Sequence, residues 1–170
     1  MSPGPIAVGK ESWWHRWLVA PVKVQLTQGM SVNRISWTIA LGFVLGVFPV
    51  MGTTSLVCLL VGWMFQLNQA ILQVFKTLVY PLHLALILVF IRLGERLYGV
   101  PLIAFSIPEL IGKFKADPLQ FAQDFGIAAW HGVSAWLVIA PFAVILIKIA
   151  TTPILRGLSK SLETNKVVAA

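Results

Sequence analysis

Charged residues are scarce in this chain, and their scarcity excludes an ordinary water-soluble domain. Only 11% of the 170 residues are charged, whereas 58% are hydrophobic, and the mean hydropathy is +0.84. A soluble domain is about one quarter charged and needs polar side chains to cover its surface. Lipid must therefore cover part of this chain, so the composition predicts an all-α integral membrane protein.

Cysteines and catalytic motifs are also scarce. Cys58 is the only cysteine and lies inside an apolar run, so the chain can form no internal disulfide. The sequence has no carboxylate within an apolar core, no histidine and acidic pair at metal-ligand spacing, and no serine nucleophile motif. We therefore expect no enzyme activity, no cofactor and no metal site.

The net charge of +7 comes from basic residues that flank the apolar runs. They do not form a basic face mixed with polar residues, so we expect anionic membrane lipids as partners and no nucleic acid. Positive flanks mark the cytoplasmic side of membrane spans. We expect a multi-pass protein of the bacterial cytoplasmic (inner) membrane with both termini in the cytoplasm.

The N-terminal segment, residues 1–26, contains the stretch "ESWWHRWLVAPVKVQL". Its three tryptophans and its cations suit an amphipathic helix in the lipid headgroup region, which Pro21 would end or bend. A helix that packs on another protein is the alternative. No secretory signal peptide is visible here, so we expect the membrane segments to belong to the mature protein.

Residues 27–151 form the predicted membrane domain. It has three hydrophobic regions, at residues 35–65, 71–91 and 125–149. The first would be about 46 Å long as one helix, whereas a hydrocarbon core is only about 30 Å thick. Pro49 and Gly52 divide it into two arms, so it is either one long kinked span or a re-entrant pair of half-helices. Each of the other two regions is close to the length of one transmembrane helix.

The remaining segments hold most of the other charged residues. Residues 92–124 hold three prolines and balanced charges, and we expect short interfacial helices there. Residues 152–170 form a predicted basic cytoplasmic tail. Termini on the same side require an even number of crossings, which favours a re-entrant first region followed by about two transmembrane helices.

The break in the first region is the main candidate for a substrate-binding site. If the second arm begins near Gly52, the amides of Thr53, Thr54 and Ser55 lie at the positive end of a helix dipole, beside hydroxyl groups. Such a helix end suits a carboxylate or a phosphate. The alternative is that Thr53 only caps the arm with its hydroxyl.

A second break, "TLVYPLHLAL", places Pro81 inside the next region. Paired interruptions of apolar segments indicate a transport site built from broken helices. Lys76 and His83 are the ionisable residues of this region, about two helical turns apart, so they would share one face and supply positive charge. Alternatively, Lys76 extends toward the membrane surface, and His83 forms a buried hydrogen bond to a carbonyl that the proline frees.

Two of the four glycines in the first region, Gly42 and Gly46, form the small-xxx-small pattern "GFVLG". This pattern permits close contact between helices, either within one chain or between chains. A homo-oligomer and an envelope enzyme both remain possible partners.

Several segments between Leu26 and Gly99 share a spacing of glycine and proline with a known family. They are "GMS" at residues 29–31, "ALGFVLGVFPVMGTTS" at 40–55, Asn68, Pro81 and "RLGERLYG" at 92–99. In these residues the chain resembles the uncharacterised prokaryotic membrane family called domain of unknown function 2062. Val32 and Tyr80 depart from the family pattern, which often has proline at the first position and asparagine at the second.

The resemblance implies a bacterial membrane protein without an established activity, joined in some relatives to a glycosyltransferase. We expect transport or flipping of an anionic envelope substrate, either lipid-linked or phosphate-bearing. The alternative is a non-transporting accessory or scaffold protein for cell-envelope enzymes such as glycosyltransferases.

Overall fold

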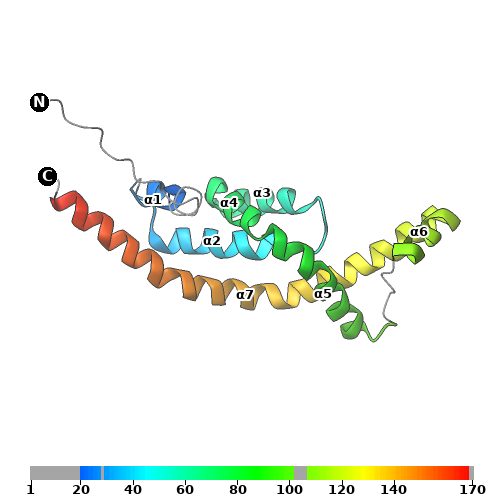
Figure 1. Cartoon of the computed structure of the whole chain (residues 1–170). Coiled ribbons are helices and arrows are strands. Elements are labelled where there is room, and N and C mark those ends of the chain that lie inside the picture. Colours follow the sequence, from blue (N-terminus) through cyan, green and yellow to red (C-terminus); the bar gives the residue numbers. More distant parts are fainter. Residues whose placement is uncertain (1–19, 28, 102–106, 169–170) are drawn as a thin grey trace, which may run out of the picture.

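The computed structural model describes residues 20–27, 29–101 and 107–168 (Figure 1), and every regular element in these ranges is an α-helix. The helices are α1 (Ala20–Thr27), α2 (Val32–Gly46), α3 (Thr54–Met64), α4 (Gln69–Leu78), α5 (Tyr80–Tyr98), α6 (Ile107–Ala116) and α7 (Pro118–Val168). The predicted helical fold is confirmed for these residues. Most of the tryptophan-rich segment lies outside them, so its predicted interfacial position stays a prediction.

Helices α2 and α3 form an antiparallel hairpin. Irregular residues 47–53 connect them, and Gly52 has a φ of +84°, a value that residues with side chains rarely adopt. The side chain of Arg34 donates a hydrogen bond to the carbonyl of Gln66, so the start of α2 meets the chain just after α3. The two arms of the first hydrophobic region therefore turn back on themselves and do not form one kinked helix.

Helix α4 packs on α2 through the two glycines of "GFVLG". A Cβ atom at Gly42 would lie 3.0 Å from the carbonyl oxygen of Leu72 and from Cβ of Phe75, and a Cβ atom at Gly46 would collide with Val79. The small-xxx-small pattern thus serves a contact within this chain. Because the later glycine meets the later part of α4, the two helices run in the same direction.

Helices α4 and α5 are the halves of a bent pair that meet at Val79 with an angle of 69°. Pro81 lies in the first turn of α5, where its missing amide hydrogen removes no helical hydrogen bond. The second predicted break is therefore confirmed.

The prediction of short interfacial helices across residues 92–124 is only partly right. Helix α5 continues without interruption to Tyr98 and ends at Gly99, which has a φ of +65°. Helix α6 is a separate short helix, and α7 begins already at Pro118. The helix that contains the second hydrophobic region therefore ends at Gly99, in the left-handed conformation, and not at the charged residues that follow Ile91.

Helix α7 has 51 residues, about 76 Å at 1.5 Å per residue, and keeps Pro141 and Pro153 inside it. It therefore contains both the third hydrophobic region and the residues predicted as a tail, with no helix end near residue 151. It runs antiparallel to α2, because Thr152 donates a hydrogen bond to Ser36 while Trp136 donates one to the carbonyl of Val44.

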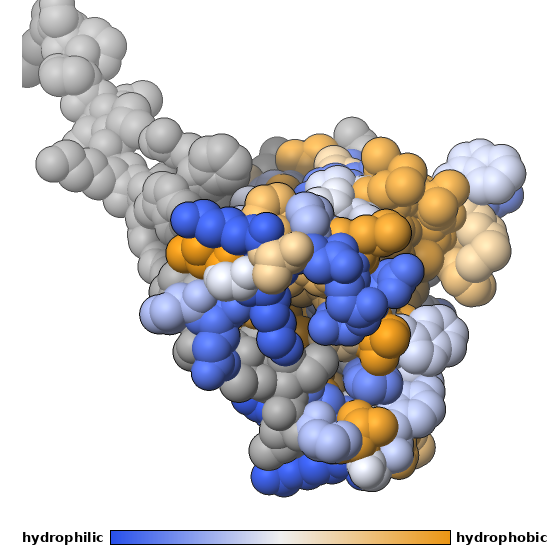
Figure 2. All heavy atoms as spheres, turned by 90° about the vertical axis from the view of Figure 1, so that its right-hand side faces the viewer, coloured by the Kyte–Doolittle hydropathy of each residue, from blue (hydrophilic) through white to orange (hydrophobic). Residues whose placement is uncertain are grey.

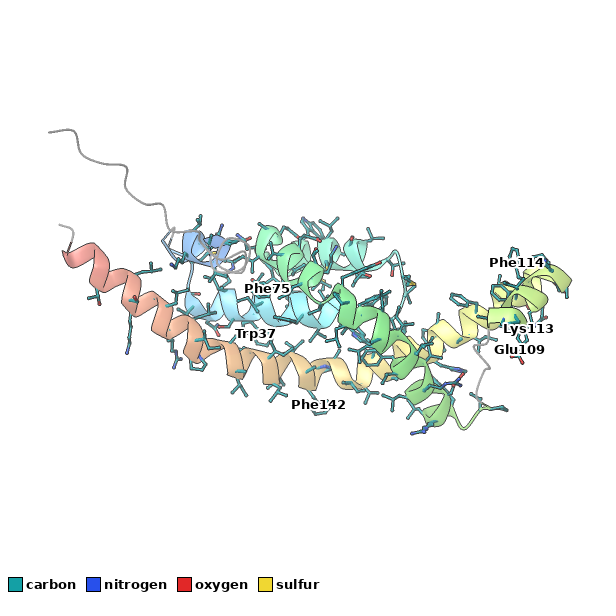
Figure 3. All side chains as sticks on the ribbon, viewed as in Figure 1. Trp37, Phe75, Glu109, Lys113, Phe114 and Phe142 are labelled. Atoms are coloured by element: carbon teal, nitrogen blue, oxygen red, sulfur yellow. The ribbon has the colours of Figure 1, made fainter. Side chains whose placement is uncertain are left out.

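Among the described residues, one helix is long and apolar enough to span a membrane, over Pro118–Leu162, and the bent pair of α4 and α5 passes the same test as a single span. Only 22% of the most apolar 18-residue stretch of α7 is buried against the rest of the chain. Phe142, for example, is 72% exposed and projects away from α2 (Figure 3), whereas Trp37 lies between α2 and α7. Helices α2 and α3 are shorter than the roughly 20 residues of a full crossing.

Different helices meet at the two ends of the molecule. At one end, Val22 of α1 and Leu155 of α7 share a buried cluster with Ile35 and Ile71, so the N-terminal helix lies beside the last part of α7. The other end carries α6 and the start of α7. Figure 2 views the molecule from that end and shows hydrophilic residues gathered there, with hydrophobic residues at the upper right.

Candidate functional site

The first turn of α3 offers amide groups for binding. Thr53 precedes the helix, but its hydroxyl donates to the carbonyl of Val50 at 3.0 Å and makes no capping hydrogen bond. The first helical bond runs from the amide of Val57 to the carbonyl of Thr53. Within the described ranges, the amides of Thr54, Ser55 and Leu56 therefore have no backbone or capping acceptor.

Lys76 lies beside these amides. Its ammonium nitrogen donates a hydrogen bond of 2.7 Å to the hydroxyl of Ser55. The packing of α4 along α2 produces this contact, because it brings the last turn of α4 next to the first turn of α3. Lys76 is half-buried and extends toward the start of α3 and not toward the turn at residues 66–69. The structure thus brings together two of the predicted site residues from different helices.

His83 lies beyond the bend, in the first turn of α5. Its Nδ1 is 2.8 Å from the carbonyl oxygen of Gly46, its ring stacks on Tyr80 with centroids 6.0 Å apart, and only 2% of the residue is exposed. The expectation that Lys76 and His83 share one helical face is wrong, because the bend at Val79 separates them. His83 does form a buried hydrogen bond to a carbonyl at a helix end, but that carbonyl is Gly46 at the other break and not one that Pro81 frees.

The loop after α2 is covered by α7 on one side and is exposed to the surroundings on the other side. Trp136 of α7 donates to the carbonyl of Val44 at 3.1 Å and packs edge-on against Phe48. Pro49 is buried, and its Cβ lies 3.5 Å from the position of a Cβ built on Gly132 of α7. Gly52 is exposed and has open space around it. The start of α3 is therefore open to a ligand on the Gly52 side.

Sequence reasoning missed a buried ion pair in α5. Glu95 is fully buried, and its carboxylate accepts a hydrogen bond of 2.9 Å from Arg92, whose side chain is 36% exposed. The expectation that no carboxylate lies in an apolar core is therefore wrong. The spacing of the two residues in "RLGERLYG" is the only signal that pointed to the pair, since i,i+3 residues share a helical face.

The same part of α5 crosses α7 closely. A Cβ atom at Gly94 would collide with the backbone of His131, so glycine is required there. His131 is 8% exposed, and its ring lies against the ring of Tyr98 with the centroids 4.8 Å apart. Its Nδ1 has no hydrogen-bond partner among the described residues.

Within the same ranges, no three His, Cys, Asp or Glu side chains lie close enough to hold a metal ion. No family model matches the chain, and no curated protein or solved structure matches it significantly. The resemblance to domain of unknown function 2062 therefore stays a prediction.

Proposed function

We propose that this chain is a small integral membrane protein of the bacterial inner membrane that binds an anionic envelope substrate, lipid-linked or phosphate-bearing, and transports or flips it. The hydrogen bond between Lys76 and Ser55 is the observation that carries the proposal. It joins a cation to a helix end that attracts anions.

In this proposal, the bent pair of α4 and α5 crosses the membrane once and α7 crosses it a second time. The hairpin of α2 and α3 enters the bilayer and leaves it on the side of the termini. The exposed apolar side chains of α7 and the cluster that joins α1 to Leu155 support this arrangement. Lipid would cover the apolar surface, and both termini would lie on the positively charged cytoplasmic side.

The chemistry of the α3 start suits an amphiphilic anion. The amides of Thr54 and Ser55 and the ammonium of Lys76 would bind the headgroup oxygens through charge-assisted hydrogen bonds, which are stronger than neutral ones. Met51 and Leu56 beside them are 60% and 58% exposed and would contact acyl chains. The buried His83 would hold the break in place and leave the charge to Lys76.

Lipid co-purification with detection by mass spectrometry tests the binding step. We expect wild-type protein to carry enriched anionic lipid and the Lys76→Gln variant to carry about ten- to a hundredfold less, because one charge-assisted hydrogen bond is worth about 1.5 to 3 kcal/mol. Lys113→Gln, which changes an exposed lysine on α6, is the matched control and should behave like wild type. Equal amounts of anionic lipid in wild type and Lys76→Gln would show that Lys76 does not bind the lipid.

A flipping assay tests the transport step. Wild-type protein in vesicles should accelerate the movement of a short-chain fluorescent phosphatidylglycerol between leaflets, and Lys76→Gln should slow it. Binding without accelerated movement would contradict transport.

An accessory role is the second candidate, and the length of α7 favours it. At about 76 Å, this helix is more than twice as long as a hydrocarbon core is thick, so parts of it would project into water and offer a surface to an envelope enzyme. The resemblance to domain of unknown function 2062 supports a glycosyltransferase as such an enzyme. Protein that binds anionic lipid but does not move it would favour this role.

A further inference from the structure

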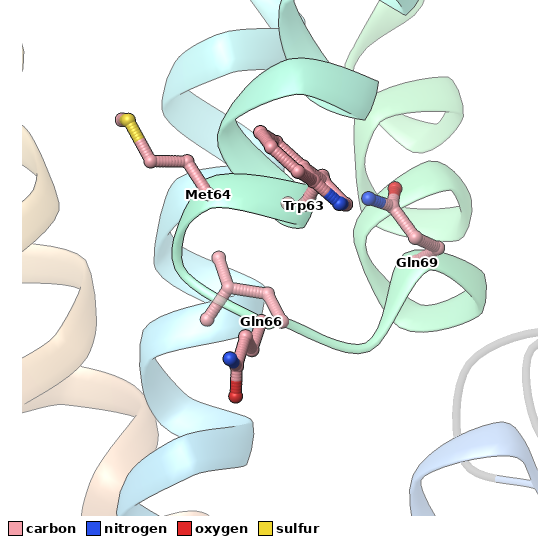
Figure 4. Close-up of a pocket in the computed structure, with 6 residues that line it drawn as sticks. Trp63, Met64, Gln66 and Gln69 are labelled. Atoms are coloured by element: carbon pink, nitrogen blue, oxygen red, sulfur yellow. The ribbon is translucent and has the colours of Figure 1, made fainter.

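Two buried polar side-chain atoms have no hydrogen-bond partner in the described part of the chain, Oε1 of Gln69 and Nδ1 of His131. Gln69 lines the pocket where α3 turns into α4 (Figure 4), and its Nε2 donates to the carbonyl of Leu59 at 3.1 Å. An amide stays uncharged at every physiological pH. His131 differs, because an imidazole changes its charge near neutral pH. The substrate site proposed at Lys76 does not use it.

Close packing between α5 and α7 surrounds His131. Its backbone lies so near Gly94 that a Cβ atom at the glycine would collide with it. Its ring lies against the ring of Tyr98, with the centroids 4.8 Å apart. Ser134 donates its hydroxyl hydrogen to the carbonyl of Trp130, so the hydroxyl of Tyr98 donates to Ser134 at 2.9 Å. The hydroxyl beside the imidazole is therefore already engaged elsewhere.

The charged groups of α5 at this crossing bond to each other. Glu95 is fully buried, and its carboxylate accepts a hydrogen bond of 2.9 Å from Arg92. The positive charge of Arg92 balances this carboxylate. Nδ1 of His131 does not bond to Glu95, since it has no partner among the described residues.

The other elements around His131 bring no counter-charge. The loop of residues 47–53 meets α7 at Gly132 and contains no ionisable side chain. On α7 itself, the nearest charged residue is Asp124, about two turns before His131. Among the described residues, no acidic side chain is therefore bonded to this imidazole.

A proton on the buried imidazole would be costly in this arrangement. A charged imidazole carries hydrogen on both ring nitrogens, so Nδ1 would become a donor without an acceptor. Burying an unpaired charge costs far more than burying a neutral ring. A proton therefore favours an arrangement in which α5 moves away from α7 and water reaches the ring. The contact between the helices is stable at neutral pH and becomes weaker as the pH falls.

We infer that His131 is a pH sensor that opens the crossing of α5 and α7 when its imidazole binds a proton. In the proposed topology this crossing lies toward the outer side of the membrane, near Val100, so it responds to the pH outside. That location rests on the membrane placement proposed above. The opening itself depends neither on transport nor on the anion site at Lys76.

Double electron–electron resonance between two spin labels on the full chain in detergent tests the inference. With Cys58 replaced by alanine, the labels are placed at Leu97 of α5 and Ile139 of α7, which are both exposed. Between pH 8 and pH 5, the ratio of molecules with a longer distance to those with a shorter one should rise. The rise should be at most about tenfold per pH unit, because one proton is bound.

Three control measurements locate the response. His131→Phe keeps a ring that can pack on Tyr98 but binds no proton, so it should show the shorter distance at both pH values. His83→Gln changes the other described histidine and should keep the response. A second pair of labels at Asn33 and Ile154, where α2 begins beside the last part of α7, should keep its distance.

Each result decides the question. An unchanged distance in wild type between pH 8 and pH 5 would overturn the inference, whatever the variants do. A response that persists in a folded His131→Phe or His131→Gln variant would also overturn it, because another group would then bind the proton. An equal change at the second pair of labels would mean general unfolding by acid. Lys76→Gln separates the two proposals, because it should lose anionic lipid and keep the response to pH.

Discussion

The imidazole of His83, in the first turn of α5, lies 2.8 Å from the carbonyl oxygen of Gly46, the last residue of α2. One hydrogen bond thus joins the two breaks in the hydrophobic sequence, across 37 positions of the chain. The carbonyl at the end of α2 has no helical partner, and burial makes an unsatisfied acceptor costly. His83 therefore holds the hairpin of α2 and α3 against the bent pair of α4 and α5.

His83→Phe should destabilise the protein. The substitution keeps a ring of similar size but leaves the Gly46 carbonyl unsatisfied, which should cost about 1 to 3 kcal/mol. For a chain of this length we expect the melting temperature in detergent to fall by roughly 2 to 4 °C per kcal/mol. His83→Gln retains a donor and should recover part of the loss. Identical melting of wild type and His83→Phe, followed by circular dichroism, would contradict this role.

Gly46→Ala should also destabilise the protein, because the added methyl group would collide with Val79 and push α4 away from α2. Overpacking of this kind costs about 1 to 3 kcal/mol. Gly157→Ala is the matched control on an open part of α7, where the same change should stabilise the helix slightly. The two variants should therefore shift the melting temperature in opposite directions, and a neutral Gly46→Ala would argue against the close contact.

Cysteine labelling tests the membrane topology. With Cys58 replaced by alanine, we place one cysteine at Ala70, near the start of α4, and another at Val100, just after α5; both positions are exposed. In intact cells an impermeant thiol reagent should label Ala70→Cys poorly and Val100→Cys well, because the two positions lie on opposite sides of the proposed membrane. Inverted vesicles should give the reverse pattern. Labelling of Ala70→Cys in intact cells would place the start of α4 on the outer side of the membrane and would contradict the proposed topology.

The ion pair of Arg92 and Glu95 should show a measurable coupling. A double-mutant cycle with Arg92→Met and Glu95→Gln should give about 1 to 3 kcal/mol of interaction energy, since Glu95 is fully buried, whereas exposed pairs give less than about 1 kcal/mol. Glu109 and Lys113 are exposed, oppositely charged residues four positions apart on α6 (Figure 3), and the same cycle at these positions should give a smaller coupling. Equal coupling in the two cycles would mean that the burial of Glu95 does not strengthen its pair.

The two helix breaks could be predicted because their causes are local. Pro49, Gly52 and Pro81 restrict the backbone locally, and each lies at or beside a break. Proline alone does not suffice, since Pro141 and Pro153 lie inside the continuous helix α7. The exposed amides at the start of α3 could also be predicted, because they follow from any new helix after a break.

Contacts between helices could not be predicted from the same information. The meeting of Lys76 with Ser55 depends on α4 running along α2, and the burial of Glu95 depends on where α5 crosses α7 at Gly94. Hydropathy shows where apolar residues lie but not where a helix ends. The apolar residues of the third region stop near Ile149, so the helix was expected to end there. The helix instead continues through Pro153, as helices do when neighbouring groups compensate for the lost bond.

Helix α7 also contains two positions at which it can bend. Pro141 and Pro153 each remove one helical hydrogen bond, and helices bend most easily at such positions. Pro141 lies in the part that runs beside α2, and Pro153 follows Thr152, which is bonded to Ser36 near the start of α2. A bend at either proline would change the angle between the basic last part of α7 and the rest of that helix, beside the start of α2.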